Sequence, residues 1–372
     1  MKNNFDLGKS PVTITWETTQ SCDPDYCLAA GQPERDPLEL TAQEAEKLIR
    51  DIAELRPPIF LMTGGDPLGR DDIYSMVGYA ACNGLRPVMV LRAGPQLTRA
   101  AIAELKHAGL ARLELTLQGA SAELHDHLSR MEGSFQQTLR AIRWANEWRL
   151  PVQIRTDISE KNLPDLENIA ALLAKHRILM WSVAFPVPKD DVTEEQVPSP
   201  GEFEDAFARL YEVSRKVPFK VKTVEAQHYR RYVLQQSSRA ARERLFSGQA
   251  EFSSEGIPGV MPVNESRGSL FISNTGEVSP GCCLPSVGNV RLESLKEIYR
   301  DSELFNALRN VSNLHGKCGR CPFKEICSGS RARALYMTGD MFNEDPACSY
   351  EPPPLPGARA SSAGNAGPQD QG

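Results

Sequence analysis

Four cysteines near the end of the chain are spaced as in a metal centre. They occur in the order Cys318-x2-Cys321-x5-Cys327-x20-Cys348. Thiolates from one short segment can surround a single metal centre, and soft sulfur ligands select zinc or an iron–sulfur cluster. The spacing leaves both metals open, because zinc sites more often contain two tight Cys-x2-Cys pairs.

Two further cysteines, Cys22 and Cys27, lie near the start of the chain. They follow a β-branched apolar run, residues 12–16, and share their loop with Asp23 and Asp25. Because a strand end fixes where the side chains of the next loop point, such a loop is a suitable platform for metal ligands. The alternative is a surface loop that carries two reduced thiols.

Three other cysteines give weaker signals. Cys282 and Cys283 are adjacent and follow a predicted hairpin, so one of them could be an extra ligand. Cys82 falls inside a predicted helix and is expected to be a buried structural thiol.

A glycine pair in residues 63–68 (TGGDPL) follows the second apolar run of the chain. Two glycines let a ligand approach the backbone closely, and exposed amides and carbonyls can bind an amino-acid head group. A tight turn between a strand and a helix would explain the same residues.

Short β runs that alternate with amphipathic segments must position these groups. The expected strands are residues 12–17, 59–63, 88–92, 113–118, 152–158 and 180–186. The expected helices are residues 41–56, 71–83, 98–108, 134–148, 163–175 and 200–216. Six strands that are each followed by a helix indicate parallel βα units, in an open partial barrel or a doubly wound sheet. In both folds, ligands bind at the C-terminal ends of the strands.

The composition changes along the chain and predicts five parts. They are an N-terminal segment (1–10), the βα region (11–217), a basic and aromatic helical insert (218–260), a cysteine-rich domain (261–351) and a disordered tail (352–372). Residues 268–278 predict a hairpin that opens the cysteine-rich domain. The tail is rich in Pro, Gly, Ala and Ser and contains almost no large apolar residue.

Charge and hydropathy exclude several classes of partner. The 372-residue chain has a formal net charge of −6, which argues against nucleic-acid binding because that needs a basic face. The N-terminus has no apolar core of a signal peptide, and no apolar run approaches the roughly 18 residues of a membrane span. We therefore expect a cytoplasmic protein without membrane contact, whose nine cysteines bind metal rather than form disulfides.

The order of these features resembles the radical SAM superfamily with a C-terminal SPASM or twitch domain. It is similar in particular to the proteins related to heme d1 and alternative heme biosynthesis enzymes. The segments that carry the resemblance include TWETTQSC, LMTGGDPL, GLARLELTLQGAS, EAQHYRRYV, ISNTGEVSPG and KCGRCPFKEICSGSRARALYMTGD. The resemblance implies an α/β fold, with a partial (β/α)6 radical-SAM-type barrel followed by a small cysteine-rich SPASM/twitch domain.

The resemblance also implies roles for individual residues. The family's GGEP motif matches Gly64, Gly65, Asp66 and Pro67, which would contact the amino group of S-adenosylmethionine. Thr116 and Gln118 match positions that face the ribose, and Arg155 matches one that meets the carboxylate. Cys318, Cys321, Cys327 and Cys348 match the ligands of an auxiliary [4Fe–4S] cluster, which favours iron–sulfur over zinc.

The first cysteine loop departs from the family pattern. The family has three cysteines in a C-x3-C-x2-C motif, which bind three irons and leave the fourth iron for S-adenosylmethionine. Here Cys22 and Cys27 match the first and third ligands, and the loop is two residues shorter and lacks the middle cysteine. Asp23 or Asp25 could replace it, although oxygen holds a cluster less well than thiolate does. A second, non-standard iron–sulfur cluster at Cys22 and Cys27 is one possibility, and a single metal is another.

Two hypotheses about function follow. The first is an active enzyme that takes an electron from a donor such as ferredoxin or flavodoxin and cleaves S-adenosylmethionine reductively. The resulting 5′-deoxyadenosyl radical would act on a tetrapyrrole, a peptide or a small metabolite. The second is a degenerate homologue that keeps the auxiliary cluster but serves as a binding, electron-transfer or partner protein.

The substrate-side candidates lie in the predicted insert. They are Glu225, His228, Tyr229 and Arg230. Helical spacing would put Glu225, His228 and Tyr229 on one face, with Arg231 displaced from it. The alternative is a solvated, charged helix face. Trp181 and Phe185, on the sixth strand, are expected to be core residues.

Overall fold

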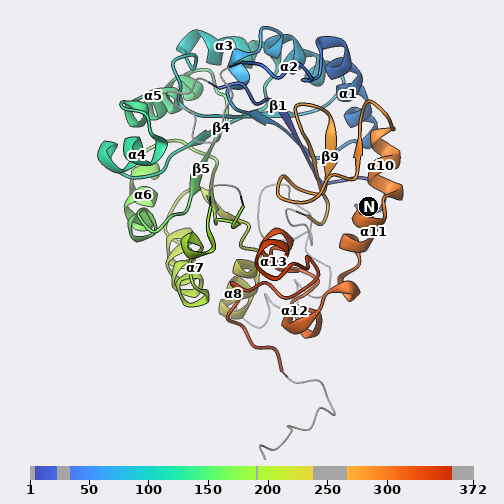
Figure 1. The fold of residues 1–372 in the computed structure, drawn as a ribbon. Coiled ribbons are helices and arrows are strands. Elements are labelled where there is room, and N and C mark those ends of the chain that lie inside the picture. Colours follow the sequence, from blue (N-terminus) through green and yellow to red (C-terminus); the bar gives the residue numbers. More distant parts are fainter. Residues whose placement is uncertain (1–4, 23–33, 190–191, 238–265, 354–372) are drawn as a thin grey trace, which may run out of the picture.

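The computed structural model describes residues 5–22, 34–189, 192–237 and 266–353. These residues form one curved sheet with helices on its outer side (Figure 1). The strands are β1 (Thr13–Thr19), β2 (Ile59–Gly64), β3 (Pro87–Leu91), β4 (Arg112–Thr116), β5 (Val152–Asp157), β6 (Met180–Ala184), β7 (Lys220–Val224), β8 (Ser269–Ile272), β9 (Glu277–Ser279) and β10 (Gly288–Asn289).

The helices include the expected six and several others. They are α1 (Ala42–Leu55), α2 (Ile73–Cys82), α3 (Arg99–Ala108), α4 (Ala122–Ser129), α5 (Ser134–Glu147), α6 (Leu166–Leu173), α7 (Pro200–Ser214), α8 (His228–Gln236), α10 (Leu295–Asp301), α11 (Glu303–Arg309), α12 (Gly316–Arg320) and α13 (Arg331–Thr338). Helix α4 was not expected from the sequence. None of the described helices is long and apolar enough to cross a membrane.

The strand order among the described residues is β10-β9-β8-β1-β2-β3-β4-β5-β6-β7. Strands β1 to β7 pair in parallel, each with its successor, as βα units with right-handed crossovers require. This arrangement confirms the predicted partial barrel. The C-terminal ends of these strands lie at one edge, so the loops after β1, β2, β4 and β5 are neighbours there.

Helix α1 shows how the local sequence builds the outer layer. Thr41 accepts a hydrogen bond from the Glu44 amide, and the Glu44 carboxylate accepts one from the Thr41 amide, so the predicted capping box is present. The helix buries one apolar face against the sheet: Ala45, Leu48, Ile49, Ile52 and Leu55. Trp181 and Phe185 are buried in the same core, as expected.

Three features differ from the sequence-based predictions. The range predicted as a helical insert begins with a seventh parallel strand, β7, and its helix starts only at His228. The predicted hairpin, β8 and β9, is present, but β8 also pairs in parallel with β1. The C-terminal segment therefore extends the barrel sheet. Cys82 is exposed because it is the last residue of α2.

Candidate functional site

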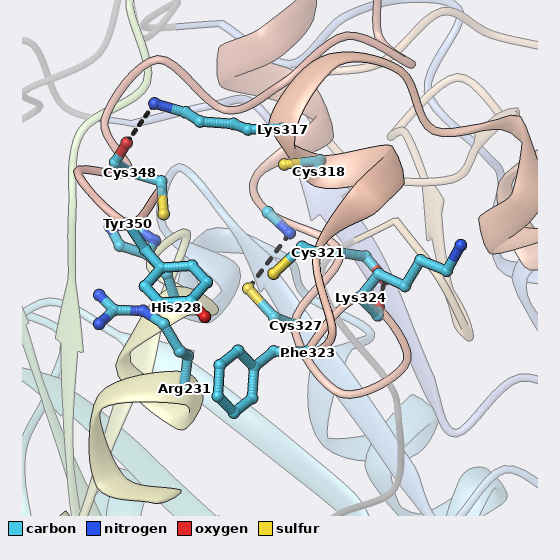
Figure 2. Close-up of a pocket in the computed structure, with 12 residues that line it drawn as sticks. His228, Arg231, Lys317, Cys318, Cys321, Phe323, Lys324, Cys327, Cys348 and Tyr350 are labelled. Carbon is cyan, nitrogen blue, oxygen red and sulfur yellow. Dashed lines mark hydrogen bonds between the residues drawn. The ribbon is translucent and has the colours of Figure 1, made fainter. Parts of the chain in front are cut away.

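The four C-terminal cysteines line one cavity, as Figure 2 shows. Cys318 lies on the short helix α12, whereas the other three lie on the loops that flank α12 and α13. The cavity wall also contains His228 and Arg231 from α8, together with Lys317, Lys324 and Tyr350. Residues up to 30 positions apart in the sequence thus line the same cavity.

Backbone amides hold two of the thiols in place. The Asp345 amide donates to Cys318 Sγ at 3.4 Å, and the Gly329 amide donates to Cys327 Sγ at 3.4 Å. Gly329 has a φ of +62°, and a Cβ there would lie 2.6 Å from Arg331 Nη2. Glycine is therefore favoured at this position, because a side chain would be strained in this backbone conformation and would contact Arg331.

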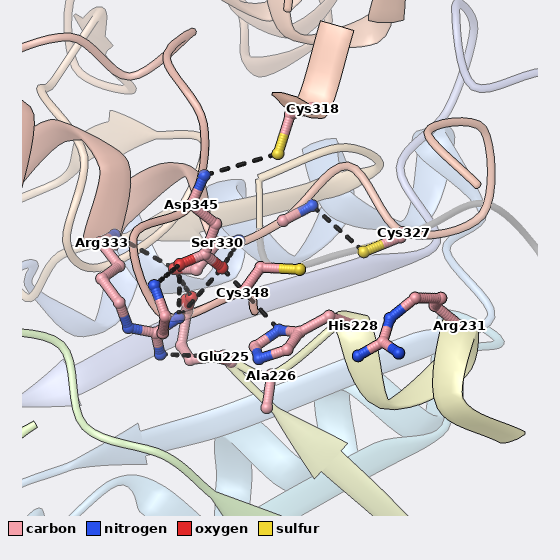
Figure 3. A network of polar contacts seen from close by, with 12 residues as sticks. Glu225, Ala226, His228, Arg231, Cys318, Cys327, Ser330, Arg333, Asp345 and Cys348 are labelled. Atoms are coloured by element: carbon pink, nitrogen blue, oxygen red, sulfur yellow. Dashed lines mark hydrogen bonds and ion pairs between the residues drawn. The ribbon is translucent and has the colours of Figure 1, made fainter. Parts of the chain in front are cut away.

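A buried ion pair joins the cysteine loops to the barrel (Figure 3). Arg333 Nη1 lies 3.1 Å from Asp345 Oδ2, and both side chains are fully buried. Arg333 Nη2 donates to the carbonyls of Pro186, just after β6, and Glu225, just after β7. The guanidinium also lies 4.9 Å from the ring centroid of Phe203 on α7. One side chain thus fixes the loop before Cys348 against two strand ends.

The cavity suits an anionic sulfur-ligated centre. Burial raises the pKa of the Cys348 thiol to about 12 and also raises the pKa values of Cys318, Cys321 and Cys327. A bound metal must displace these protons. Arg231, Lys317 and Lys324 line the wall. Arg231 also pairs with Glu204, and Lys317 with Glu344 and Glu351, so only part of this positive charge would offset that of thiolates.

Zinc fits this arrangement less well than an iron–sulfur cluster does. Across the described residues, no three His, Cys, Asp or Glu side chains converge closely enough to hold a single ion. Tetrahedral zinc requires sulfurs about 3.8 Å apart, given a Zn–S distance of about 2.3 Å. A four-iron cluster instead binds each thiolate at a separate iron, so its thiolates stand farther apart than those around one zinc ion.

The second candidate site lies where β1 and β2 end. The Gly65 amide donates to the Thr19 carbonyl at 2.9 Å, and the Asp66 amide donates to the Ser21 carbonyl at 2.8 Å. Cys22 is buried next to this turn. A Cβ on Gly65 would lie 2.4 Å from the Ser21 carbonyl oxygen and 2.9 Å from Cys22 Cβ. The glycine pair thus lets the first cysteine loop pack directly on the turn after β2.

The Asp66 side chain caps the short helix that follows. Its Oδ1 accepts a hydrogen bond from the Leu68 amide at 3.1 Å, and Pro67 opens that helical turn and is buried. Cys27, Asp23 and Asp25 lie outside the described residues, so the structure places only Cys22 of this loop.

Arg70 supports the same strand ends and was not among the residues predicted from the sequence. Its side chain is buried and donates to the Thr18 carbonyl at 2.7 Å and to Glu39 at 2.8 Å. It also lies 5.9 Å from the ring centroid of Trp16. Its position just after the GGDP turn is the one available signal in the sequence. Its burial could not be predicted, because its partners are 31 and 52 residues away in sequence.

The residues expected to face the ribose and carboxylate lie at the ends of β4 and β5. Thr116 ends β4, and Gln118 Nε2 donates to Asp157 Oδ2 at 3.0 Å. Arg155 Nε donates to Asp157 Oδ1 at 2.7 Å. The Asp157 carboxylate raises the pKa of Arg155. Burial acts to raise the pKa of Asp157, but the charge and hydrogen bond of Arg155, the hydrogen bond from Gln118 and the charge of Arg92 together lower it. The pair still keeps 36% and 45% of its side-chain surface open, so it remains accessible to a ligand.

His125 is a second residue that sequence reasoning missed. Its Nδ1 accepts a hydrogen bond from the Gln118 amide at 2.9 Å, and burial lowers the pKa of this histidine to about 4. The neutral ring therefore fixes the backbone at the end of β4.

Cys282 and Cys283 lie after β9, with 3.4 Å between their sulfurs. The hydrogen bond from Cys283 and the charges of Arg155 and Lys189 lower the pKa of Cys282 to about 7, while burial opposes them. Lys189 Nζ also donates to the Cys282 carbonyl at 3.0 Å. This segment therefore lies within electrostatic reach of the open ion pair at the end of β5.

The structure separates the four substrate-side candidates. Glu225 precedes α8, has a φ of +53° and accepts a hydrogen bond from Ser330. Tyr229 faces α7, where its ring lies 5.4 Å from that of Phe207. Burial raises its pKa to about 12. Arg230 donates to the Ile326 carbonyl at 3.1 Å.

The predicted helix face is therefore wrong. His228 and Arg231, three residues apart, line the cysteine cavity together, whereas Tyr229 belongs to the apolar core. Glu225 does not share this face because the helix begins only at His228, after the constrained residue Glu225.

Comparison with known proteins agrees with this architecture. A model of the Radical SAM superfamily matches residues 23–173, and a model of SPASM, an iron–sulfur cluster-binding domain, matches residues 264–322. The chain is similar in fold to the crystal structure of Streptococcus suis SuiB bound to S-adenosylmethionine. The TM-score is 0.66 at 14% identity, over 92% of this chain and 78% of that one.

Two curated relatives extend over nearly the whole chain. A PqqA peptide cyclase from Rhodopseudomonas palustris is 26% identical over 92% of this chain and 88% of its own length. An AdoMet-dependent heme synthase from Methanosarcina barkeri is 33% identical over 93% of this chain and 98% of its own length. The chain therefore belongs to the radical SAM superfamily and carries a C-terminal SPASM domain.

Proposed function

We propose that this protein is a radical SAM/SPASM enzyme that acts on a tetrapyrrole and binds an auxiliary [4Fe–4S] cluster through Cys318, Cys321, Cys327 and Cys348. The observation that carries the cluster assignment is the convergence of these four cysteines on one cavity with cationic walls. The tetrapyrrole is supported by the 33% identity to an AdoMet-dependent heme synthase.

The strand ends are proposed to hold S-adenosylmethionine. Gly64, Gly65, Asp66 and Pro67 would bind its amino group, Thr116 and Gln118 its ribose, and Arg155 its carboxylate. When bound, an iron–sulfur cluster and S-adenosylmethionine together supply one-electron cleavage to a 5′-deoxyadenosyl radical. The residues of the chain would orient S-adenosylmethionine. Asp157 aligns Arg155, and His125 holds the backbone of Gln118.

The substrate would enter at the open Arg155–Asp157 end of the barrel. Lys189 adds positive charge there beyond the Arg155–Asp157 pair, which suits the propionate groups of a tetrapyrrole. A peptide is the alternative substrate, since a PqqA peptide cyclase is also a relative. The electron donor is proposed to be a ferredoxin or flavodoxin.

A second candidate function has its own observation. The first cysteine loop is two residues shorter than the family's motif and lacks the middle cysteine. A site with fewer thiolates holds a cluster less firmly. The second candidate is therefore a degenerate homologue that keeps the auxiliary cluster and serves as a binding, electron-transfer or partner protein.

Anaerobic reconstitution with iron and sulfide separates the two functions. Iron would be counted in the wild type, in the Cys22→Ala, Cys27→Ala double variant and in Cys318→Ala, with Cys82→Ala as a control outside both sites. The active enzyme predicts about eight irons, about four fewer in the double variant, and 5′-deoxyadenosine on reduction with S-adenosylmethionine. An iron porphyrin with propionate groups should shift its visible absorbance when it binds.

The other outcomes are equally distinct. About four irons that persist without Cys22 and Cys27, and no 5′-deoxyadenosine, would support the degenerate homologue. Stoichiometric zinc in the C-terminal cavity would contradict the cluster assignment in both functions.

A further inference from the structure

His228 is a buried polar group without a partner in the cysteine cavity. Its side chain is about 1% exposed, and its ring lies 5.0 Å from the ring of Phe203 and 4.7 Å from that of Phe207. It lines the same cavity as the four cysteines. Neither ring nitrogen has a hydrogen-bond partner among the described residues. Such a group destabilises the fold if it stays unsatisfied.

Asp345 does not satisfy this histidine. Its Oδ2 lies 3.8 Å from His228 Nδ1, which is beyond hydrogen-bond distance. Both carboxylate oxygens are already occupied, because they accept hydrogen bonds from the Ser330 and Ala347 amides and from Arg333. The imidazole carries at least one N–H in either of its protonation states, so a donor remains in the cavity.

The ring is also held rigidly. His228 begins α8, three residues after Glu225, whose carbonyl accepts from Arg333 and whose carboxylate accepts from Ser330. Phenylalanine rings on α7 fix the imidazole from the barrel side. Figure 3 shows the histidine beside this network, with the Cys348 side chain next to it in the view. A donor fixed in this way loses little conformational entropy on binding an acceptor.

We infer that His228 donates its N–H to a sulfur of the auxiliary cluster and thereby raises the reduction potential of that cluster. This inference rests on the auxiliary cluster in the proposed function. Hydrogen bonds to cluster sulfurs stabilise the reduced, more negative state. His228 is thus a tuning residue of the cluster and not a group that contacts the substrate.

The test compares His228→Phe, which removes the donor, with His228→Gln, which keeps an N–H. Phenylalanine suits a pocket that Phe203 and Phe207 already line. Both changes would be made in the full-length Cys22→Ala, Cys27→Ala protein, so that only the C-terminal cluster contributes. Iron is counted, and the midpoint potential is measured by redox titration with EPR detection. His107→Phe, on the outer helix α3, is the matched control.

We expect His228→Phe to keep about four irons and to bind its electron about tenfold less favourably, which corresponds to a midpoint about 59 mV lower. His228→Gln should recover part of the shift, and His107→Phe should show none. A purely structural role would not distinguish the two His228 variants in this way.

Two results would overturn the inference while the proposed function stands. One is an unchanged midpoint in His228→Phe at full iron content. The other is loss of iron in that variant with a strong nitrogen coupling in pulsed EPR of the ¹⁵N-histidine-labelled protein, which would make His228 a ligand. The labelled protein needs no variant to fold, and a weak coupling with an exchangeable proton supports the hydrogen bond. Protein that binds no iron at the four cysteines would instead refute the proposed function.

Discussion

Removal of Arg333 should be among the most damaging single changes outside the apolar core. Arg333 Nη1 lies 3.2 and 3.1 Å from the two oxygens of Asp345, and neither side chain is exposed. Arg333→Met keeps the volume of the side chain but leaves a buried carboxylate without its counter-charge. Loss of one partner from a buried pair costs about 3–5 kcal/mol, or a factor of roughly 10² to 10⁴ in the folded-to-unfolded ratio.

The matched control is Arg99→Met. Arg99 Nη2 lies 2.8 Å from Glu147, a similar distance, but the two side chains are 65% and 49% exposed. Exposed pairs contribute about 0.2–1 kcal/mol, so the two variants should differ by about 2 kcal/mol or more. Urea denaturation of the reduced, iron-free protein measures both free energies of unfolding.

A double variant tests the cause. If the unpaired buried charge of Asp345 causes the loss of stability in Arg333→Met, then Asp345→Asn in that background should restore part of the free energy of unfolding. Equal free energies of unfolding for Arg333→Met and Arg99→Met would refute the reasoning, because burial would then not determine the strength of the pair. A double variant that is less stable than Arg333→Met would show that the carboxylate is needed for its amide contacts instead.

Three further predictions follow from the strand ends and the hairpin. Gly65→Ala places a Cβ 2.4 Å from the Ser21 carbonyl oxygen and should lower the free energy of unfolding by about 1–3 kcal/mol. Gly201→Ala, where a Cβ would face open space, should not lower it. Equal effects of the two substitutions would contradict the close packing at Gly65. Hydrogen bonds from Arg291 and from Thr41 lower the pKa of Glu44 from 4.5 to about 2. The ionised carboxylate of Glu44 therefore stabilises the fold above pH 4.5, and this contribution disappears as the pH falls towards 2. Because Glu44 is 34% exposed, solvent screening limits the contribution of the Arg291 pair to about 1 kcal/mol. Glu44→Gln, which preserves the capping box, should remove that part of the pH dependence in acid denaturation, and an unchanged profile would exclude the pair as its source. Iodoacetamide should alkylate Cys282 faster than the exposed Cys82 at pH 7, because Cys282 has a pKa of about 7. Cys283→Ala should slow the alkylation of Cys282. Mass spectrometry of the labelled peptides measures both rates, and faster alkylation of Cys82 would contradict the prediction.

Local sequence patterns were sufficient to predict the first six strands and the clustering of the four C-terminal cysteines. The strands β1 to β6 alternate with amphipathic helices, and the four cysteines lie close in sequence, so both signals are contained in short segments. Strand β7 was missed because KVKTV is only half-buried and carries two lysines at the sheet edge. A strand of this kind is stabilised by its partner β6 and not by its own apolar pattern.

Buried charges could not be predicted from the sequence. Arg333 and Asp345 are ordinary surface residues by type, and only the meeting of α13, the cysteine loops and the ends of β6 and β7 buries them. Arg70 depends in the same way on Thr18 and Glu39, which are distant in sequence. The helix face of α8 was mispredicted for a related reason, since the left-handed residue Glu225 delays the start of the helix.

The parallel pairing of β8 with β1 means that β1 is an interior strand only while the C-terminal segment is attached. A chain cut before residue 266 would expose the amide and carbonyl groups of β1 along one side, next to the apolar side chains of Ile14 and Trp16. An unprotected edge of this kind is a template for intermolecular strand addition. The SPASM segment thus also protects the edge of β1 from aggregation. We do not expect the barrel to be obtained as a soluble, monomeric fragment without it.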